Sequence, residues 1–403
     1  MSIFISIVGL GFLILVHEGG HFFVARAVGM NPRKFYVGFP PALAKTTRNG
    51  IEYGIGAIPL GGYVKIPGMH RPAAADLDLY FGRAVEERPS LRHPLDALRD
   101  RLDASDHTGA REALDPLRTA LEATTLSHPA QRSAQRGLTE VGDALAPDAY
   151  WRARTWKRVA VIFAGPGANL VLAVVLFALL FMSGGGRATS TVAEVVPQSP
   201  AAAMGLQPDD RIVTIDGRPV EPDRIAQRIS GSGGQPLTIT VVRDGQTLPL
   251  GPTEPAETDG VFRLGFVLRG EGLGPVESTW EAIRVTGIVT KEIGATIGRL
   301  VTGDGREQIA SPVGIVQGSS QAADQGIESY LWVLGLISLS LALLNLLPLL
   351  PLDGGHIAFS LLEGIRRKAV AREVYERVSV VGIAVVLLLF FIGLSNDIGR
   401  LGN

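Results

Sequence analysis

The sequence predicts a polytopic α-helical membrane protein with four transmembrane helices and an inserted β-rich domain. Its 403 residues are 46% hydrophobic and only 19% charged, with a mean hydropathy of +0.24, which is too apolar for a soluble chain of this length. Four segments are each apolar enough to cross about 30 Å of hydrocarbon as a helix. Between the second and third segments, short β-branched runs are bounded by Pro, Gly and Asp-Gly turns.

The charge balance and the residue types exclude several classes of function. The 38 Lys and Arg residues nearly cancel the 39 Asp and Glu residues, so the formal net charge is -1 and no basic face is offered to nucleic acid. Because the chain has no Cys, it has no disulfide, no thiolate metal site and no cysteine nucleophile. Any bound metal must be held by His and carboxylate side chains. A lipid bilayer is the expected surrounding, and no nucleic acid is expected as a partner.

The segments follow one another in a clear order. The first apolar run has no Lys or Arg before it and no small-residue cleavage site after it, so it is interpreted as a retained helix rather than a signal peptide. The predicted organisation is a first transmembrane helix (1–30), a β-loop (31–69), a helical insert (70–156), a second transmembrane helix (157–183), a β-rich domain (187–270), an amphipathic helix and linker (271–326), a third transmembrane helix (327–352), a loop (353–377) and a fourth transmembrane helix (378–396).

Three soluble segments have their own patterns. Residues 51–66 read IEYGIGAIPLGGYVKI, and the alternation of apolar and small residues around Gly-Gly predicts a short β-hairpin close to the membrane. In the insert, leucines recur at helical spacing, which predicts a small helical hairpin. In residues 271–326, isoleucines spaced like one helix face predict an amphipathic helix along the membrane surface.

Basic residues near the span ends predict the orientation. They follow the first span, precede the second, and lie between the third and fourth: Arg33, Lys34, Lys45, Arg48, Arg152, Arg154, Lys157, Arg158, Arg366, Arg367, Lys368, Arg372 and Arg377. Between the second and third spans, only Arg187 lies close to a span end. The insert and the loop before the fourth span are therefore expected to be cytoplasmic. The β-rich domain and both termini are expected to be extracytoplasmic.

The first span contains HEGGH, with His17, Glu18 and His21. Positions i and i+4 share a helix face, so both imidazoles can reach one Zn²⁺ while Glu18 holds a water. The alternative is a chance match or a polar site packed between helices. Ionisable residues inside an apolar span need a partner or a cavity, which favours metal binding. A catalytic zinc site then needs a third protein ligand.

The third span supplies a candidate for that ligand. It ends in NLLPLLPLDGGH, which places Asp353 after Pro348 and Pro351 and before two glycines. The prolines break the helix and the glycines permit close helix approach, so Asp353 can turn inward to a metal. The alternative is that Asp353 caps the next helix at the cytoplasmic boundary. His356 is less favoured as a ligand because it lies one turn further on.

Together these motifs resemble a known family. HEGGH in a first span, GPGAN in a second and NLLPLLPLDG in a third are similar to the site-2 protease family of intramembrane zinc metalloproteases. The resemblance is greatest to bacterial members that cleave anti-sigma factors, such as the regulator of sigma-E protease and its relatives with one PDZ domain. It covers nearly the whole chain apart from residues 70–150. It implies one Zn²⁺ per chain on His17, His21 and Asp353, with Glu18 as general base, although such ligands also accept other divalent metals.

Further motifs extend the resemblance to substrate binding. The family's GPxxN element falls on residues 165–169, its membrane-associated β-loop on residues 61–65, and SPVGI at 311–315 is similar to its GPVGI element. The β-loop is expected to add its edge to the substrate as an extra strand. The substrate-binding residues that the resemblance implies are Asn169, Asn345, Gly61, Gly62 and Tyr63. An interhelical hydrogen bond is the alternative role for each of the two Asn side chains.

The β-rich domain resembles a PDZ domain of bacterial proteases over residues 199–220. PDZ domains bind a peptide along a sheet edge and a loop of backbone amides, and here Gly205 and Leu206 are the expected peptide-binding residues. The alternative is a β module that only fills space or dimerises. The enterobacterial members have two such domains and this chain has one, which leaves their tandem gating without a counterpart here.

The resemblance implies an intramembrane protease of the bacterial inner membrane. Its expected substrate is a single-span membrane protein of the anti-sigma-factor type, already trimmed on its outer side by an upstream site-1 protease. A noncatalytic membrane adaptor that binds peptides through the PDZ domain is a second possibility, and the intact Glu18 argues against it. A zinc transporter is a third, and the lack of an internal repeat argues against that.

Overall fold

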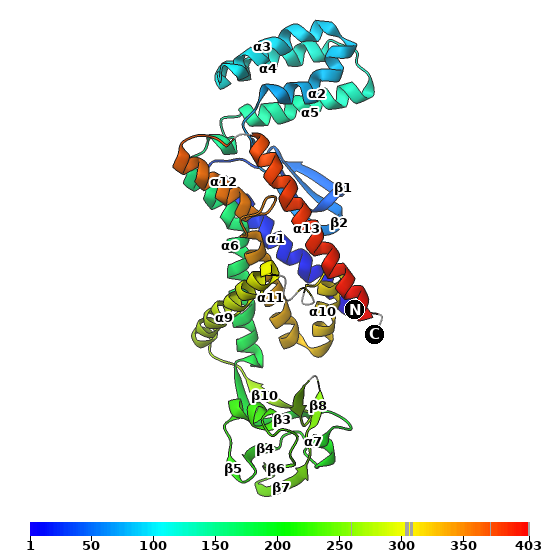
Figure 1. Cartoon of the computed structure of the whole chain (residues 1–403), viewed down its shortest axis with the longest axis vertical. Helices are drawn as coiled ribbons and strands as arrows, with labels where there is room; N and C mark the ends of the chain where they lie inside the picture. The colour runs from blue at the N-terminus through cyan, green and yellow to red at the C-terminus, as the bar shows by residue number, and fades with distance from the viewer. Residues whose placement is uncertain (259, 303–305, 307–308, 371, 402–403) are drawn as a thin grey trace. The chain divides into compact units, whose positions relative to one another are not determined.

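Figure 1 shows the computed structural model, in which residues 1–258, 260–302, 306, 309–370 and 372–401 are described. The helices are α1 (Ser2–Ala27), α2 (Ala74–Glu87), α3 (Arg92–Asp103), α4 (His107–Glu122), α5 (His128–Leu145), α6 (Thr155–Leu180), α7 (Pro200–Ala203), α8 (Ile225–Ser230), α9 (Pro275–Thr302), α10 (Pro312–Gln325), α11 (Ile327–Asn345), α12 (Asp353–Arg366) and α13 (Arg372–Leu401). The strands are β1 (Lys34–Arg48), β2 (Ile51–Lys65), β3 (Arg187–Val195), β4 (Arg211–Ile215), β5 (Arg218–Pro219), β6 (Leu237–Arg243), β7 (Gln246–Thr253), β8 (Ala256–Thr258), β9 (Val261–Arg263) and β10 (Phe266–Glu271). Short 3-10 turns and one π-turn are η1 (Pro89–Leu91), η2 (Tyr150–Arg152), η4 (Pro222–Arg224) and the π-turn η3 (Phe181–Gly185).

The chain divides into two compact units. The first unit consists of Met1–Leu172, Ile293–Gln321 and Ile337–Asn403, and the second unit consists of Ala173–Glu292 and Ala322–Leu336. The first unit therefore contains the HEGGH motif, the insert and the predicted Asp353 ligand. The second unit contains the β-rich domain.

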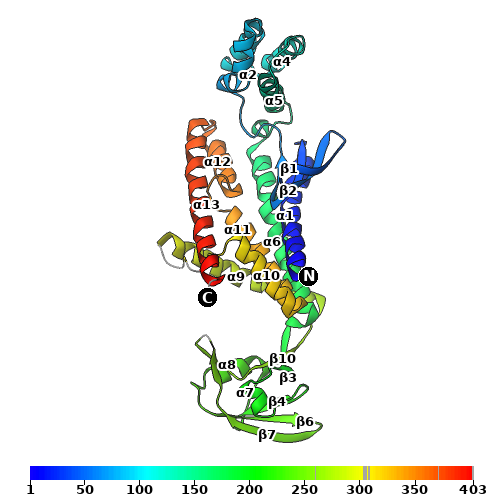
Figure 2. The same cartoon turned by 90° about the vertical axis from the view of Figure 1, so that its right-hand side faces the viewer.

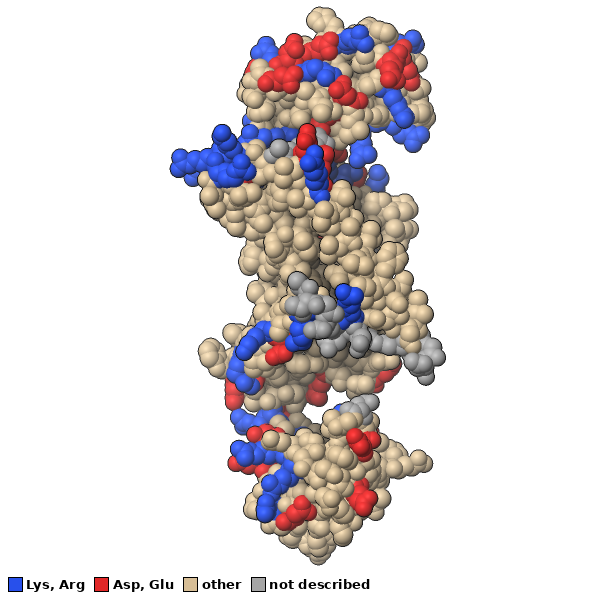
Figure 3. All heavy atoms as spheres, in the orientation of Figure 1, with Lys and Arg blue, Asp and Glu red and all other residues tan. Residues whose placement is uncertain are grey.

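Four helices are long and apolar enough to cross a membrane, at Ser2–Ala27, Thr155–Gly185, Ile327–Asn345 and Glu373–Gly399. A helix bonds its interior backbone amides within itself, as a hydrocarbon environment requires. The four apolar spans expected from the sequence are thus present as helices. Figure 3 shows almost only uncharged side chains along the middle of α13.

The end of the third span differs from the prediction. The sequence predicts a helix over 327–352 and a loop over 353–377, whereas α11 ends at Asn345 and α12 occupies much of the predicted loop. Pro348 and Pro351 end α11 early because they lack the amide hydrogen that a continuing helix needs. α12 is amphipathic, and its Ile357 packs against the buried cluster that includes Ala25 and Val161.

β1 and β2 form a small sheet, and its pairing corrects the predicted hairpin. The sequence predicts a hairpin within residues 51–66 around Gly61 and Gly62. In the structure β2 pairs with β1, and the tight turn between them lies at Asn49 and Gly50, which both have positive φ. Asn-Gly is the strongest short signal for such a turn. The true partner of residues 51–66 therefore lies upstream of that turn.

β1 is the shared partner of two parts of β2. Its residues 34–37 pair with residues 62–65 on one side and with residues 52–55 on the other. Tyr36 and Tyr63, from paired positions, stack with ring centroids 5.1 Å apart. Figure 2 shows this sheet beside α1, consistent with the packing of Gly62 against that helix.

The insert is a small helical bundle rather than the predicted two-helix hairpin. Residues 74–145 form α2 to α5 (Figure 1), because a proline follows α2 and capping residues start the later helices. Asp106 accepts a hydrogen bond from the Gly109 amide at the start of α4, and Ser127 caps α5. The leucines that predicted helical spacing, with Phe81, form a core of their own.

The β-rich domain has a sheet with strand order β10-β3-β4-β6-β7, and β5 pairs with β4. Alternate residues of β4 and β6 point into one apolar core with α8, for example Ile212, Ile239 and Ile225. The first and last strands of the domain are neighbours, since Arg187 pairs with Glu271. The chain therefore leaves and re-enters the helical part at adjacent points.

The predicted linker before α11 also contains a helix, α10. α13 holds its start, because Asp397 accepts hydrogen bonds from the backbone amides of Ser311 (2.8 Å) and Gly314 (3.0 Å). A methyl group at Gly314 would overlap the Asp397 carboxylate. The SPVGI motif is thus a helix start whose cap comes from another helix.

Candidate metal centre

α1 places two histidines side by side in the first unit. His17 and His21 are one helical turn apart, and they are only 8% and 7% exposed. Both imidazoles point to the side of α1 where α12 begins with Asp353. These three side chains are the one group of His and acidic residues within the described part of the chain that can hold a metal ion.

The three ligand atoms have the spacing of a tetrahedral zinc site. His17 Nε2 lies 3.2 Å from Asp353 Oδ2, His21 Nε2 lies 3.4 Å from the same oxygen, and the two nitrogens are 3.3 Å apart. Atoms bound at about 2.05 Å to a tetrahedral ion are about 3.3 Å from one another. Among the described groups, none hydrogen-bonds the buried Asp353 Oδ2. The residues therefore fit a zinc ion.

Backbone and amide groups orient the two imidazoles. His21 Nδ1 lies 2.8 Å from the carbonyl oxygen of Val161 in α6, which makes Nδ1 the protonated nitrogen and leaves Nε2 free to bind metal. Asn169, also in α6, is fully buried, and its side-chain nitrogen lies 3.4 Å from His17 Nδ1. Ser338 of α11 donates a hydrogen bond to the Asn169 carbonyl oxygen.

Glycines permit the close approach of these helices. A methyl group at Gly20 would overlap the Ala164 carbonyl, and one at Gly165 would overlap the His21 imidazole. In the same way, a methyl group at Gly354 would overlap the Leu346 carbonyl. The glycines of HEGGH, GPGAN and LDGG are thus required because they lack a side chain. The sequence shows these motifs but not the close contacts that require glycine.

A polar network fixes α12 to the start of α6. Arg158 forms an ion pair with Glu363 at 2.7 Å and donates a hydrogen bond to Ser360 at 3.0 Å. The Tyr150 hydroxyl is 3.0 Å from the same Ser360 hydroxyl. Asp353 is the first residue of α12, so this network sets where the third ligand lies. Sequence reasoning missed these residues because their meeting depends on the helix packing.

Glu18 lies between the metal centre and the β-loop. Its side chain contacts Gly62, where a methyl group would overlap the Glu18 Cγ atom. The structure thus brings Glu18 together with the predicted β-loop residue Gly62. This arrangement places a carboxylate beside the three side chains that can hold a metal ion and beside a strand edge.

Comparison with known proteins identifies the family. The family model described as Peptidase family M50 matches residues 5–389. The chain belongs to peptidase family M50. This is the site-2 protease family, so the chain is a zinc metalloprotease of a membrane-protein family, and zinc is its cofactor.

The M50 peptidase resembles bacterial relatives along its whole length. A candidate zinc metalloprotease of Agrobacterium fabrum is 33% identical, with 97% of this chain and 94% of the relative covered. The zinc metalloprotease RasP of Geobacillus kaustophilus is 28% identical, with 99% and 98% covered. Insert, spans and β-rich domain all fall within these matched lengths.

Other predicted site residues of the M50 peptidase lie apart from the metal ligands. Asn345, at the end of α11, donates its amide to the Leu341 carbonyl of its own helix. His356 is hydrogen-bonded to the Tyr375 hydroxyl at 2.7 Å and does not belong to the ligand group. Gly61 has a positive φ at the bend before residues 62–65.

The two residues predicted to bind peptide in the β-rich domain both make contacts within that domain. Leu206 is 4% exposed and lies in the domain core, and the Gly205 carbonyl accepts a hydrogen bond from Arg243. The Leu206 side chain therefore belongs to the domain core, and the Gly205 carbonyl is used within the domain. Peptide binding through the backbone amides of these two residues stays a prediction.

Proposed function

We propose that the protein hydrolyses a peptide bond inside the transmembrane segment of a single-span membrane protein. The observation that carries this proposal is the tetrahedral spacing of His17, His21 and Asp353 within apolar helices, with Glu18 beside them. A soluble substrate has no route to such a site, whereas a transmembrane segment reaches it from within the bilayer.

The side chains divide the chemistry among them. Zinc bound at His17, His21 and Asp353 supplies the Lewis acidity for peptide hydrolysis. Glu18 takes a proton from the attacking water as the carbon–oxygen bond forms, and it delivers a proton to the amine nitrogen as the carbon–nitrogen bond breaks. Gly62 packs against the Glu18 side chain and so keeps it beside the β-loop.

Residues 62–65 offer the substrate a strand partner. The Lys65 carbonyl accepts a hydrogen bond from the Arg33 amide, so Lys65 and Tyr63 face β1 and the alternate residue Val64 faces the opposite edge. Among the described strands, none pairs with that opposite edge. A transmembrane helix must unwind before hydrolysis, and this edge supplies the backbone partners that an unwound segment requires.

The proposed setting is regulated proteolysis in a bacterial inner membrane. The substrate is of the anti-sigma-factor type and is first trimmed by a site-1 protease. The β-rich domain acts as a single PDZ domain that admits the trimmed form. The basic residues around the spans support an orientation with the insert in the cytoplasm and the β-rich domain and both termini outside. In Figure 3 basic side chains gather at the end of α12, where Arg366, Arg367 and Lys368 are exposed.

Replacing the base tests the proposal. Glu18→Gln keeps the three metal ligands but removes the proton acceptor, so zinc should stay near one per chain while cleavage of a single-span anti-sigma-type reporter falls by about 100-fold or more. Metal content of the detergent-purified protein and reporter cleavage are measured for both proteins. A fully active Glu18→Gln variant would contradict the mechanism, and zinc without cleavage in the wild type across reporters would favour the peptide-binding adaptor.

A further inference from the structure

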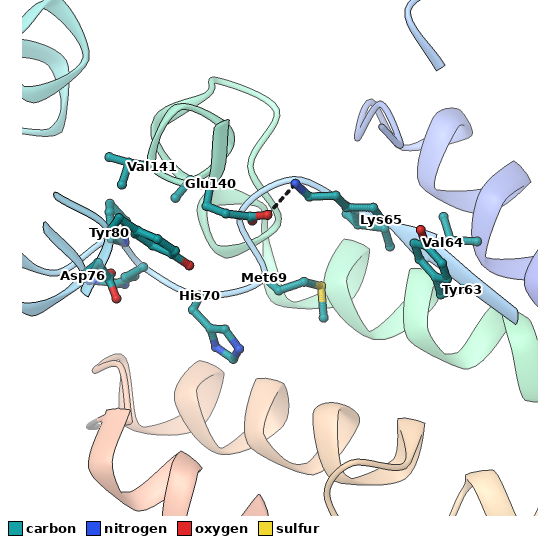
Figure 4. Close-up of a pocket in the computed structure, with 14 residues that line it drawn as sticks. Tyr63, Val64, Lys65, Met69, His70, Asp76, Tyr80, Glu140 and Val141 are labelled. Atoms are coloured by element: carbon teal, nitrogen blue, oxygen red, sulfur yellow. Dashed lines mark hydrogen bonds and ion pairs between the residues drawn. The ribbon is translucent and has the colours of Figure 1, made fainter. Parts of the chain in front are cut away.

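A pocket of about 370 Å³ lies between the β-loop and the insert, both in the first unit. Figure 4 shows Tyr63, Val64 and Lys65 on one side and Tyr80 of α2 and Glu140 of α5 on the other. We call it the strand–insert pocket. Its lining residues are Tyr63, Val64, Lys65, Ile66, Gly68, Met69, His70, Arg71, Pro72, Asp76, Tyr80, Glu140, Val141 and Ala144.

The pocket continues directly from the catalytic centre. Gly62 contacts the Glu18 side chain, and Val64, two residues later on the same strand, is part of the pocket wall. Ile66 follows two residues later, which is about 7 Å along an extended strand. A peptide that added to the open edge at Val64 and continued in the same direction would therefore enter the pocket within a few residues of the scissile bond.

Ion pairs hold the insert against this strand. The Lys65 amino group lies 2.9 Å from Glu140 and 3.0 Å from Asp143, and Arg33 lies 2.9 Å from Asp143 and 3.1 Å from Asp148. All three carboxylates belong to α5 or to the residues just after it. Because α5 packs into the insert's own core, the far wall of the pocket is a folded surface at a fixed place beside the strand.

The chemistry of the pocket suits a peptide. Apolar side chains such as Val64, Met69 and Val141 form much of the wall, and Tyr63 and Tyr80 add aromatic faces. In and around the pocket, three cations face four carboxylates, so one negative charge is left over; they are Arg33, Lys65, Arg71, Asp76, Glu140, Asp143 and Asp148. A surplus carboxylate at the rim suits the Lys and Arg residues that flank the cytoplasmic ends of transmembrane segments.

We infer that the strand–insert pocket binds the cytoplasmic juxtamembrane segment of the substrate, as an extended peptide with an apolar side chain in the pocket and a basic residue at its rim. This inference rests on the proposed function and gives the insert a role in substrate choice. The insert then contacts the substrate residues next to the membrane, while the metal centre cleaves the transmembrane segment.

Cross-linking tests the inference, and the absence of Cys makes every introduced thiol unique. Tyr80→Cys places a thiol in the pocket, and Leu79→Cys places one on the same helix at a residue that is 66% exposed and does not line the pocket. Both are made in the full-length Glu18→Gln protein and mixed in membranes with a reporter that has one Cys at successive cytoplasmic flank positions. Proximity raises the effective thiol concentration, so Tyr80→Cys should form about tenfold more disulfide than Leu79→Cys.

The outcomes separate the two claims. If the wild type cleaves the reporter but Tyr80→Cys cross-links no better than Leu79→Cys, the pocket does not bind the flank and the proposed function stands. If the wild type cleaves no single-span reporter, the proposed function fails and this inference fails with it. Met69→Cys, on the opposite wall, repeats the comparison should Tyr80→Cys lose its fold.

A charge exchange supplies a second, functional readout. Glu140→Lys reverses the rim charge at a residue whose side chain is 37% exposed, and Asp143 still pairs with Lys65. The kcat/KM for a reporter with a basic flank should fall by about fivefold, and an acidic flank should restore it. Glu122→Lys, at an exposed residue of α4 that does not line the pocket, should leave kcat/KM unchanged for both reporters. Equal effects of the two variants would overturn the inference.

Discussion

At the scale of single residues, the metal centre depends on groups that have no side chain at all. Gly165 lies against the His21 imidazole, and His21 is held from the other nitrogen by the Val161 carbonyl. The imidazole is therefore held in position between Gly165 and the Val161 carbonyl. This is why a residue with no ligand atom belongs to the metal centre.

We expect Gly165→Ala to weaken zinc binding. The added methyl group overlaps the imidazole and displaces Nε2 from its ligand position, so zinc affinity should fall by about 10- to 100-fold and cleavage with it. Metal content against a chelator series measures this. Gly11→Ala is the matched control, because a methyl group there meets nothing within 4 Å. Normal zinc affinity in Gly165→Ala would show that the helices separate freely.

Asn169 makes the interhelical contact that the sequence predicts as its alternative role. When Nε2 of His17 binds metal, its Nδ1 carries a proton and needs an acceptor. Among the described residues, the buried Asn169 Oδ1 has no partner, and a half-turn of the amide brings that oxygen to Nδ1. Contact of Asn169 with substrate stays a prediction, and its full burial beside His17 favours the alternative, a positioning group.

Substitution of Asn169 separates these roles. Asn169→Leu removes the acceptor and should lower zinc affinity by about tenfold, whereas Asn169→Asp keeps an acceptor and should retain most of it. Chelator titration of zinc distinguishes the two variants before any activity is measured. Unchanged zinc affinity in Asn169→Leu, together with a raised KM, would instead indicate the substrate contact.

At the scale of elements, the sequence predicted what local pattern determines. The spacing of His17 and His21 and the length of the four apolar runs are local properties, and both predictions agree with the helices in the structure. The β-loop was paired wrongly because Gly61-Gly62 looks like a turn, while the partner strand lies beyond Asn49-Gly50. Pairing between distant segments depends on packing that a linear pattern does not show.

The β-rich domain has a buried ion pair that sets its response to acid. Asp210 is fully buried and meets Arg243 at 2.6 Å, and the Gln207 amide also donates to it. Burial alone raises the pKa of Asp210, but the hydrogen bonds from Arg243 and the Gln207 amide outweigh it and hold the pKa below its usual range.

The domain should therefore lose stability in acid. A lowered carboxyl pKa contributes stability above the unfolded value, about 3.9, and loses it as pH falls through the folded value, so protection of β4 and β6 should decline from about pH 4 downward. Hydrogen exchange of the full-length protein measures this.

Arg243→Met leaves a buried charge and should destabilise the domain by about 3 kcal/mol or more at neutral pH. Asp209→Asn removes an exposed ion pair and should change hydrogen exchange of the domain little. Equal destabilisation by Arg243→Met and Asp209→Asn would contradict a special role for the buried pair.

At the scale of the whole molecule, the chain consists of two compact units. The metal centre and the insert belong to the first unit, and the β-rich domain is a separate folded body in the second. The order of these parts and the grouping of His17, His21 and Asp353 agree with the sequence prediction, but the sequence assigned no role to the insert. The ion pairs of Arg33 and Lys65 with α5 could not be predicted from the sequence, because they join residues 75 to 110 positions apart.

Removing the β-rich domain tests whether it admits only trimmed substrate. Arg187 and Glu271 are paired across neighbouring strands, so their Cα atoms are about 5 Å apart and a short glycine linker can replace residues 188–270 without moving the helices. If the domain excludes intact substrate, the shortened protein should keep its zinc and cleave the untrimmed reporter, which the wild type leaves uncut. Cleavage that still depends on prior trimming would remove the gating role, and loss of cleavage of the trimmed reporter with zinc retained would show that the domain binds substrate instead. The two helices that carry the ligands are outside the excised segment, so any change in cleavage reports on substrate access rather than on the metal centre.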